Sequence, residues 1–407
     1  MSTSSPSLFK QPKAVWAVAF AAVVAFMGIG LVDPILPAIS EKLNASPTQA
    51  ELLFTSYLLV TALAMFVSSW VSGKVGARTT LLAGLSLVVV FAALAGSSGT
   101  VNQVIGFRAG WGLGNALFIS TALATIVGAA SGGAEAAIVL YEAALGVGIA
   151  VGPLLGGLLG SISWRAPFFG TAVLMVVALT LIAVMMRADA VPRTPAKFSA
   201  PFTALKHVGL QRLAATALLY NIGFFTLLAY TPFPLGFGAI GLGLTFFGWG
   251  AAVAVTSVWV APRLTRRYPR TRVLTVVFAS LAVVLGTAAV VTSVPAALVV
   301  CVVSGGALLG VLNTVLTESV MEVSDAPRSV ASSAYSSVRF LGGAIAPPLA
   351  AILADVVGPW LAYTVAAIAV LGSAWIVHSS RDVLSRVDGV SETSLEEAAA
   401  ISVGDAG

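Results

Sequence analysis

Residues 148–157 read Gly-Ile-Ala-Val-Gly-Pro-Leu-Leu-Gly-Gly, and the surrounding stretch of residues 143–164 contains no charged side chain. A helix needs about 20 consecutive apolar residues to cross the hydrocarbon core of a bilayer. The glycines at positions 148, 152 and 156 recur every four residues, so they share one helix face and let a neighbouring helix approach closely. The proline at position 153 removes a backbone donor and bends such a helix. We therefore predict a bent, tightly packed membrane-spanning helix here.

The composition extends this interpretation to the whole chain. Of the 407 residues, 58% are hydrophobic and only 9% are charged, whereas soluble proteins carry roughly 25% charged residues. So few charges cannot cover the surface of a soluble domain, and so much hydrophobicity excludes intrinsic disorder. The single cysteine, Cys301, excludes a disulfide scaffold and a multi-cysteine metal cluster. We predict an integral membrane protein and expect no cofactor and no metal.

Twelve segments are apolar and long enough to span a bilayer as helices. Barrel strands do not fit, because they alternate polar and apolar residues and these segments are continuously apolar. We therefore predict an all-α integral membrane fold with 12 transmembrane helices. The segments cover residues 14–39, 51–72, 79–98, 101–129, 136–162, 165–186, 213–235, 242–262, 273–293, 295–323, 330–356 and 358–379.

The Lys and Arg residues predict the orientation in the membrane. With a cytoplasmic N-terminus, 17 of the 21 Lys and Arg side chains fall on the cytoplasmic side, and only Lys42 and Arg165 fall outside. Short loops rich in Lys and Arg stay in the cytoplasm. We therefore expect a multi-pass protein of the cell membrane with both termini in the cytoplasm. The sequence pI of about 9.5 then reflects attraction to the anionic inner leaflet, so we expect no nucleic-acid partner.

The twelve segments fall into two halves that resemble each other. Asp33-Pro34 near the end of the first span corresponds to Thr231-Pro232 in the seventh, and Trp70 in the second corresponds to Trp259 in the eighth. Parallel six-helix halves around a midplane site are typical of rocking secondary transporters. The predicted organisation is an N-terminal six-helix bundle over 1–186, a cytoplasmic linker over 187–212, a C-terminal six-helix bundle over 213–379 and a disordered cytoplasmic tail over 380–407.

The stretch that follows the second span resembles a motif of the major facilitator superfamily. That family usually reads Gly-x-x-x-Asp-Arg-x-Gly-Arg-Arg there, and residues 69–78 match it at Lys74, Gly76 and Arg78. The resemblance implies that these three residues take part in gating between the halves. Gly73 stands where the family has Asp, which puts the family's standard cytoplasmic latch in question. The alternative is a cationic turn that only follows the charge bias of the loops.

The strongest resemblance is carried by residues 148–157. The family's Gly-x-x-x-Gly-Pro-x-x-Gly-Gly motif is matched at every fixed position, which means at Gly148, Gly152, Pro153, Gly156 and Gly157. In that family the motif marks drug–proton antiporters with 12 transmembrane helices, which export their substrates. The resemblance therefore implies proton-coupled multidrug efflux by alternating access, with the motif acting in the conformational change. The alternative is a generic packing face of small residues.

Arg108 in the fourth span is a candidate functional residue, because a charge inside the hydrocarbon region costs at least ~2.5 kcal/mol. Residues 108–115 resemble the Arg-x-x-Gln-Gly pattern of proton-coupled family members, with Trp111 in the Gln place. Asp33 and Arg108 lie about 9 and 10 Å inside the outer surface at ~1.5 Å per residue. We expect them to pair, and we expect their separation to let Asp33 take up a proton. The alternatives are an Arg bonded to backbone carbonyls and an Asp that caps the break at Pro34.

Glu142 in the fifth span is the second candidate proton carrier. It also suits a cationic substrate, and the alternative is an interfacial position near the cytoplasmic end of the helix. Glu318 and Arg339 lie at comparable depths in the tenth and eleventh spans. We expect these two to form a structural ion pair or an inner gate.

Seven aromatic or amide side chains are candidates for contacting a substrate between the halves. They imply a largely apolar cavity with few charges, which favours amphiphilic organic molecules over sugars, nucleotides or phosphates. The seven are Tyr57, Trp111, Asn115, Asn221, Phe225, Tyr230 and Asn313.

Other classes of function fit the sequence less well. It contains no Gly-x-x-x-x-Gly-Lys-Ser/Thr loop for ATP, and His207 and His378 lie outside the span interiors. We therefore expect a transporter rather than an enzyme, which acts as a monomer on a small-molecule substrate and is driven by protons. The alternatives are a dedicated exporter of one metabolite, a proton-linked importer and a non-transporting receptor with the same fold.

Overall fold

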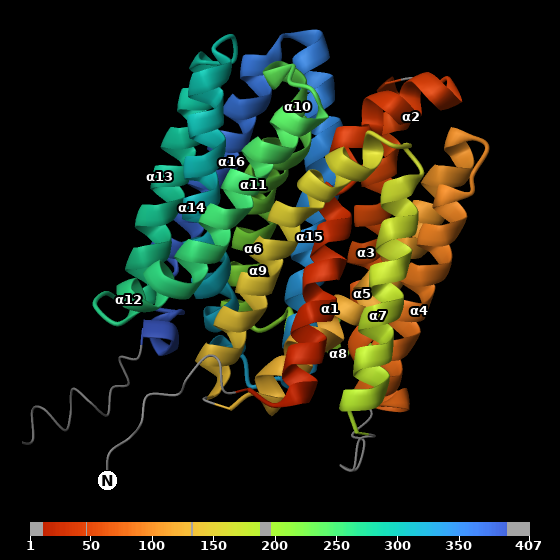
Figure 1. Cartoon of the computed structure of the whole chain (residues 1–407). Helices are drawn as coiled ribbons and strands as arrows, with labels where there is room; N and C mark the ends of the chain where they lie inside the picture. Colours follow the sequence, from red (N-terminus) through yellow and green to blue (C-terminus); the bar gives the residue numbers. More distant parts are fainter. Residues whose placement is uncertain (1–10, 46, 132, 188–196, 389–407) are drawn as a thin grey trace, which may run out of the picture.

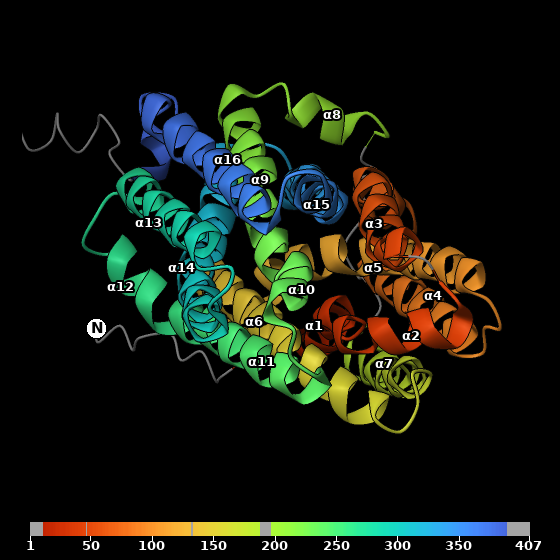
Figure 2. The ribbon, with the colours of Figure 1, turned by 90° about the horizontal axis from the view of Figure 1, so that it is seen from above.

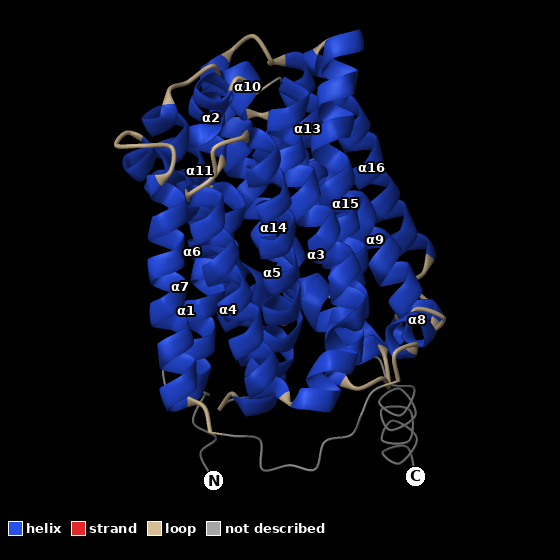
Figure 3. Ribbon diagram, turned by 90° about the vertical axis from the view of Figure 1, so that its right-hand side faces the viewer, coloured by secondary structure: helices blue, strands red, loops and turns tan. Residues whose placement is uncertain are grey.

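A computed structural model describes residues 11–45, 47–131, 133–187 and 197–388. These residues form helices and connecting turns without a strand (Figure 3). Twelve of the helices are long and apolar enough to cross a membrane. The predicted fold class and the number of spans are therefore confirmed.

The N-terminal half holds six long helices, and the first of them is shorter than predicted. Its α-helix stops at Gly30, because Pro34 cannot donate to a continuing helix, and a short 3-10 turn and a second helix follow. The elements of this half are α1 (Lys13–Gly30), η1 (Asp33–Ile35), α2 (Leu36–Leu43), α3 (Pro47–Val75), α4 (Ala77–Gly96), α5 (Val101–Ala129), α6 (Gly133–Gly160) and α7 (Ala166–Met185).

The C-terminal half repeats this arrangement, but two of its spans contain a turn of π-helix. Thr226 and Thr256 begin these turns, and each hydroxyl donates to the carbonyl oxygen four residues earlier, at 2.7 and 2.8 Å. Such back-bonding bends a helix. The elements are α9 (Val208–Phe225), η2 (Thr226–Tyr230), α10 (Pro232–Leu235), α11 (Ala239–Val255), η3 (Thr256–Val260), α12 (Ala261–Thr265), α13 (Arg270–Val290), α14 (Pro295–Val323), α15 (Arg328–Val356) and α16 (Pro359–Ser379).

The linker and the tail are more structured than the sequence indicated. A short helix, α8 (Ala200–Ala204), lies in the linker, and α9 begins at Val208 rather than at 213. Residues 380–388, predicted to be part of a disordered tail, instead form turns and the 3-10 helix η4 (Ser385–Asp388), with Leu384 and Val387 buried. Residues 188–196 and 389–407 lie outside the described part of the chain.

The two halves lie side by side (Figure 2). α6 packs against α11, and α3 packs against α15, so these four helices form most of the contact between the halves. The start of α1 and the end of α16 lie at the same end of the bundle (Figure 1), as an even number of spans requires. We call this end the terminal face; α2 and α10 mark the opposite face.

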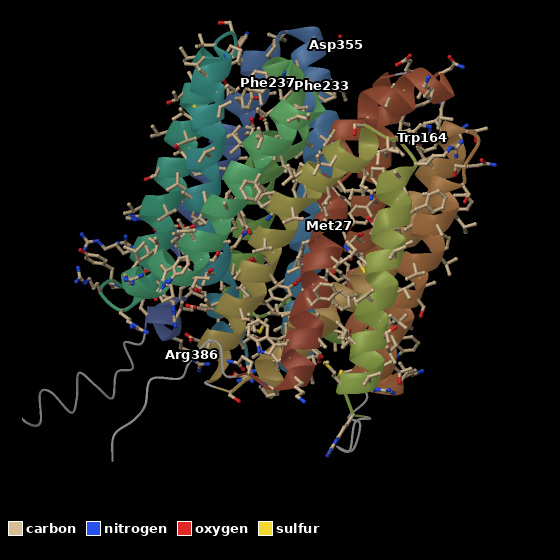
Figure 4. The ribbon with its side chains drawn as sticks, in the orientation of Figure 1. Met27, Trp164, Phe233, Phe237, Asp355 and Arg386 are labelled. Atoms are coloured by element: carbon tan, nitrogen blue, oxygen red, sulfur yellow. The ribbon has the colours of Figure 1, made fainter. Side chains whose placement is uncertain are left out.

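The glycine face of α6 packs directly on the backbone of α1. A Cβ atom at Gly152 would lie 2.5 Å from the carbonyl oxygen of Met27, and Cβ atoms at Gly148 and Gly156 would meet α1 carbonyl oxygens just as closely. Figure 4 marks Met27 on α1. Because real Cβ atoms do not approach a carbonyl oxygen so closely, only glycine fits these positions. The predicted close helix approach is confirmed, and Gly157 beside it is also buried.

The end of α3 and the turn that follows it make their contacts within the N-terminal half. Gly76 has a φ of +89°, a conformation that L side chains rarely adopt. The guanidinium of Arg78 donates to two carbonyl oxygens at the end of α7, each at 2.7 Å. The Lys74 ammonium lies 4.1 Å from the centre of the Trp70 ring. These contacts fix the turn and join α4 to α7.

Candidate functional site

Arg108 lies on α5 and is completely buried. Its Nη1 donates to the carbonyl oxygen of Gly28 on α1 at 3.1 Å, and its Nε donates to that of Leu53 on α3 at 3.4 Å. A buried guanidinium is tolerated only where acceptors replace its hydration. Arg108 therefore joins three helices of the N-terminal half.

Aromatic rings enclose the same guanidinium. Its central carbon lies 4.3 Å from the centre of the Tyr57 ring and 4.8 Å from that of Trp111, within the range of a cation–π attraction. Asn115, also on α5, donates a hydrogen bond to the hydroxyl of Tyr57. Three predicted substrate-contacting residues and one predicted proton-coupling residue thus form a single group, which we call the Arg108 cluster.

The predicted partner of Arg108 can be placed only by its backbone. Asp33 begins η1, just beyond the end of α1, and its side chain lies outside the described part of the structure. The proposed pair of Asp33 and Arg108 therefore stays a prediction.

Glu142 lies on α6 where the two halves meet, and its side chain is completely buried. Its Oε1 accepts a hydrogen bond of 2.9 Å from the hydroxyl of Thr317, which comes from α14 in the other half. Its Oε2 has no hydrogen-bond partner among the described residues. The predicted role of Glu142 in proton coupling stays a prediction.

Arg339 on α15 faces the same region from the C-terminal half and is close enough to Glu142 to interact with it electrostatically. Its Nη2 donates to Oδ1 of Asn313 at 3.3 Å, and the hydroxyl of Tyr220 donates to the same oxygen at 2.8 Å. We call Glu142, Thr317, Asn313, Arg339 and Tyr220 the Glu142 cluster. It joins one acid of the N-terminal half to four side chains of the C-terminal half.

The expected pairing of Glu318 with Arg339 is not what the structure shows. Oε2 of Glu318 lies 3.4 Å from Nε of Arg270 at the start of α13, and Arg270 also contacts Glu322. The reason is helical geometry, because successive residues point about 100° apart around the axis. Thr317 therefore faces the junction of the halves, and Glu318 turns towards α13.

Three predicted substrate-contacting residues make their contacts inside the C-terminal half. Nδ2 of Asn221 donates to the carbonyl oxygen four residues earlier on α9 at 2.9 Å. Phe225 packs where a Cβ at Gly343 of α15 would otherwise lie. The ring of Tyr230 lies edge-on to Tyr363 of α16, with 5.7 Å between the ring centres.

Two residues of the junction were missed by the sequence interpretation. Thr317 belongs to the Glu142 cluster, and Tyr335 on α15 is buried and lies within electrostatic range of Arg339 and Glu142. Thr317 and Tyr335 each lie among other polar residues of their helices, with Ser319 near Thr317 and Ser336 beside Tyr335. No spacing in the sequence distinguishes them from Thr and Tyr residues that only pack.

Comparison with known proteins identifies the family. Residues 18–347 match the model described as Major Facilitator Superfamily. The chain is 54% identical over 366 residues to the multidrug efflux protein YfmO of Bacillus subtilis (strain 168), which covers 89% of this chain and 92% of that protein. It is 30% identical over 189 residues to the tetracenomycin C resistance and export protein of Streptomyces glaucescens, over 45% of this chain and 35% of that protein.

A solved structure supports the same fold. The chain resembles the human organic anion transporter MFSD10 (TETRAN) with a TM-score of 0.76 and 17% sequence identity, over 90% of this chain and 99% of that one. The resemblance noted in the motifs after the second span and in the fifth span is thus confirmed over most of the chain. This multi-pass membrane protein, a transporter rather than an enzyme, belongs to the Major Facilitator Superfamily.

Proposed function

We propose that this protein works as a monomer that exports amphiphilic organic molecules, drugs among them, across the cell membrane in exchange for protons. Two observations support export. The chain is 54% identical over 366 residues to a protein named for multidrug efflux, and the match covers 92% of that protein's length. The complete glycine motif of α6 is that of the family's drug–proton antiporters, and it forms a packed contact with α1.

Proton coupling is supported mainly by the position of the Glu142 carboxyl group. It is buried at the junction of the halves, bonded on one oxygen to Thr317 and facing Arg339 of the other half. When Glu142 is ionised, its attraction to Arg339 holds α6 and α15 together. When it is protonated, that attraction is lost, so the charge of one side chain biases the balance between two arrangements of the halves.

The hydrogen bonds between the halves support a conformation closed on one side. The hydroxyl of Ser333 on α15 donates to the carbonyl oxygen of Met65 on α3, and that of Ser332 donates to the carbonyl oxygen of Ser120 on α5 at 3.5 Å. Both lie in the parts of their helices nearer the terminal face. We place that face in the cytoplasm, because the Lys and Arg side chains concentrate there. The described state is then closed towards the cytoplasm.

In this cycle Glu142 takes up a proton while the protein is open to the outside, after the substrate has left. The protonated carboxyl group no longer attracts Arg339, so the cytoplasmic hydrogen bonds between the halves open. The proton then leaves to the cytoplasm, and a new substrate enters. Proton and substrate therefore favour different states of the same junction, as antiport requires.

Inverted membrane vesicles that hold a preset proton gradient test this function. We expect adding ethidium to dissipate the gradient as the dye accumulates, with both followed by fluorescence. Glu142→Gln should abolish gradient-driven accumulation, and Glu322→Gln, an acid on the terminal face that is 45% exposed, should leave it intact. Equal accumulation by Glu142→Gln and wild type would contradict the proposed coupling.

A susceptibility screen of overproducing cells tests the breadth of the substrate range. Resistance to several unrelated apolar compounds is expected for a multidrug exporter. Resistance to a single compound would instead support export of one dedicated product.

A further inference from the structure

The turn between α12 and α13 concentrates positive charge on the terminal face. Together with the adjoining ends of the two helices it carries five arginines within ten residues. They are Arg263, Arg266, Arg267, Arg270 and Arg272.

Acidic side chains neutralise only part of this charge. Arg270 is paired with Glu318 and Glu322 of α14. In the part of the chain that the structure describes, no carboxylate lies within salt-bridge distance of Arg266 or Arg267, and both side chains are exposed. The guanidinium groups of Arg266 and Arg267 are therefore available to bind an anion from outside the protein.

Two adjoining hollows lie at this turn, and their linings differ. The first has a volume of about 400 Å³ and is lined by Arg266, Arg267 and Arg270. It is also lined by Asp388, whose carboxylate accepts hydrogen bonds from the backbone N–H and the hydroxyl of Thr271. The second has a volume of about 250 Å³ and is lined mainly by apolar side chains, among them Val273 and Val276. Tyr268 lines both hollows, so a polar compartment opens directly beside an apolar one.

The apolar hollow faces the lipid side of the bundle. α12 and α13 lie at the outer edge of the molecule, away from the junction of the halves (Figures 1 and 2). Val276 is 57% exposed although it belongs to a span of high hydropathy. A hydrocarbon chain is the natural occupant of such a surface. The polar hollow lies at the end of the span that begins at Arg270, where lipid headgroups are expected.

We propose that the turn between α12 and α13 binds an anionic phospholipid of the leaflet at the terminal face. Arg266 and Arg267 hold the phosphate in the polar hollow, and one acyl chain lies against Val276 along α13. The pairing of a charged and an apolar compartment distinguishes this site from the general attraction of basic loops to anionic lipid. Because Arg270 lines the polar hollow and also contacts α14, a bound lipid steadies the start of α13. The proposal does not depend on the transported substrate.

Lipid binding to the purified full-length protein tests this site. Phosphatidylglycerol and phosphatidylcholine with the same acyl chains are each titrated onto detergent-solubilised protein, and bound lipid is counted by native mass spectrometry. We expect wild type to prefer phosphatidylglycerol. The exposed double variant Arg266→Gln/Arg267→Gln should bind it at least roughly tenfold more weakly, because each cation near an anionic lipid contributes to binding.

Two further variants test whether lipid binds at this site or is only attracted by the overall positive charge of the terminal face. Lys13→Gln/Arg212→Gln removes two exposed cations from the same face, so it should bind phosphatidylglycerol like wild type. Val276→Phe, at an exposed position, should weaken binding by filling the apolar hollow. Glycerol phosphate, which has the headgroup chemistry without a chain, should not compete.

The proposal is overturned by any of three results. Equal binding of phosphatidylglycerol and phosphatidylcholine would show that the anionic headgroup does not contribute to binding. An equal loss in the Lys13/Arg212 control would show that only the charge of the face matters. Competition by glycerol phosphate at concentrations equal to the lipid would show a free anion site instead of a lipid site.

Discussion

Arg108 shows how a charge is kept inside the membrane region of this protein. Carbonyl oxygens of α1 and α3 replace its hydration, and two rings cover its faces. This matches the sequence alternative of an Arg bonded to backbone carbonyls, and it leaves the predicted Asp33 pairing open. The guanidinium is needed for its shape as well as its charge, because a lysine ammonium cannot donate in two fixed directions while lying between rings.

We therefore expect Arg108→Lys to lower the free energy of unfolding by ~1–3 kcal/mol, the usual cost of leaving buried acceptors unpaired. Arg212→Lys, at an exposed position on α9, serves as the control and should leave it unchanged. The measurement is the thermal unfolding midpoint in detergent. Equal midpoints for Arg108→Lys and wild type would show that a positive charge at position 108 is sufficient for stability and that the shape of the guanidinium is not needed.

At the scale of the helix, the glycine face of α6 is a packing requirement. Gly152→Val places a side chain against the carbonyl oxygen of Met27, so it should destabilise the protein by at least ~1–3 kcal/mol through overpacking. Gly286→Val is the matched control, because nothing lies within 4 Å of a Cβ added at this helical glycine of α13. The measurement is the thermal unfolding midpoint of each variant. Similar decreases in both midpoints would mean that the lower helix propensity of valine, rather than overpacking against α1, explains the effect.

The start of α13 is capped by a distant residue. Asp388 of η4 accepts hydrogen bonds from the backbone N–H of Thr271 at 2.9 Å and from its hydroxyl at 2.6 Å, whereas the N-cap position holds Pro269, which makes no side-chain cap. A carboxylate here satisfies a free donor and complements the helix dipole.

Asp388→Ala should therefore lower the free energy of unfolding by ~1 kcal/mol. Asp382→Ala, an exposed acid of the same segment, should have no such effect. Chemical or thermal unfolding followed by intrinsic fluorescence gives the comparison. A loss of the same size in Asp382→Ala would point to the charge of the segment rather than to the cap.

At the scale of the whole molecule, the proposed transport cycle requires the two halves to separate at the terminal face. Ser332 on α15 and Ser120 on α5 lie in contact there, at 3.5 Å between hydroxyl and carbonyl oxygens. In a chain whose single cysteine is replaced by Cys301→Ser, the pair Ser332→Cys and Ser120→Cys should cross-link on oxidation and stop export. Reductant should restore it.

The single-cysteine variants are the controls for this experiment, and oxidant should not affect them. Export is followed as dye efflux from preloaded cells or vesicles, with cross-linking checked on the same samples. Undiminished export by fully cross-linked protein would mean that this contact does not open during the cycle.

The sequence by itself determined the twelve spans, the all-α fold, the glycine face of α6 and the identity of the buried charged residues. In lipid, a spanning helix must be apolar along its whole length and can hold only a few charges. Both features are visible in the sequence of each span by itself, without information on the helices that pack against it. The first span, however, was predicted to run to residue 39, whereas its α-helix stops at Gly30 ahead of Pro34, which lacks the backbone donor that a continuing helix needs.

Only the tertiary structure decided which of these residues meet. Glu318 turns to Arg270, and Arg339 turns to Asn313 and the vicinity of Glu142. The physical reason is that neighbouring positions on a helix point about 100° apart, so a shift of one residue changes the partner helix. In an apolar helix no hydrophobic stripe indicates which side faces lipid and which faces protein, and the packing of the two halves settles it.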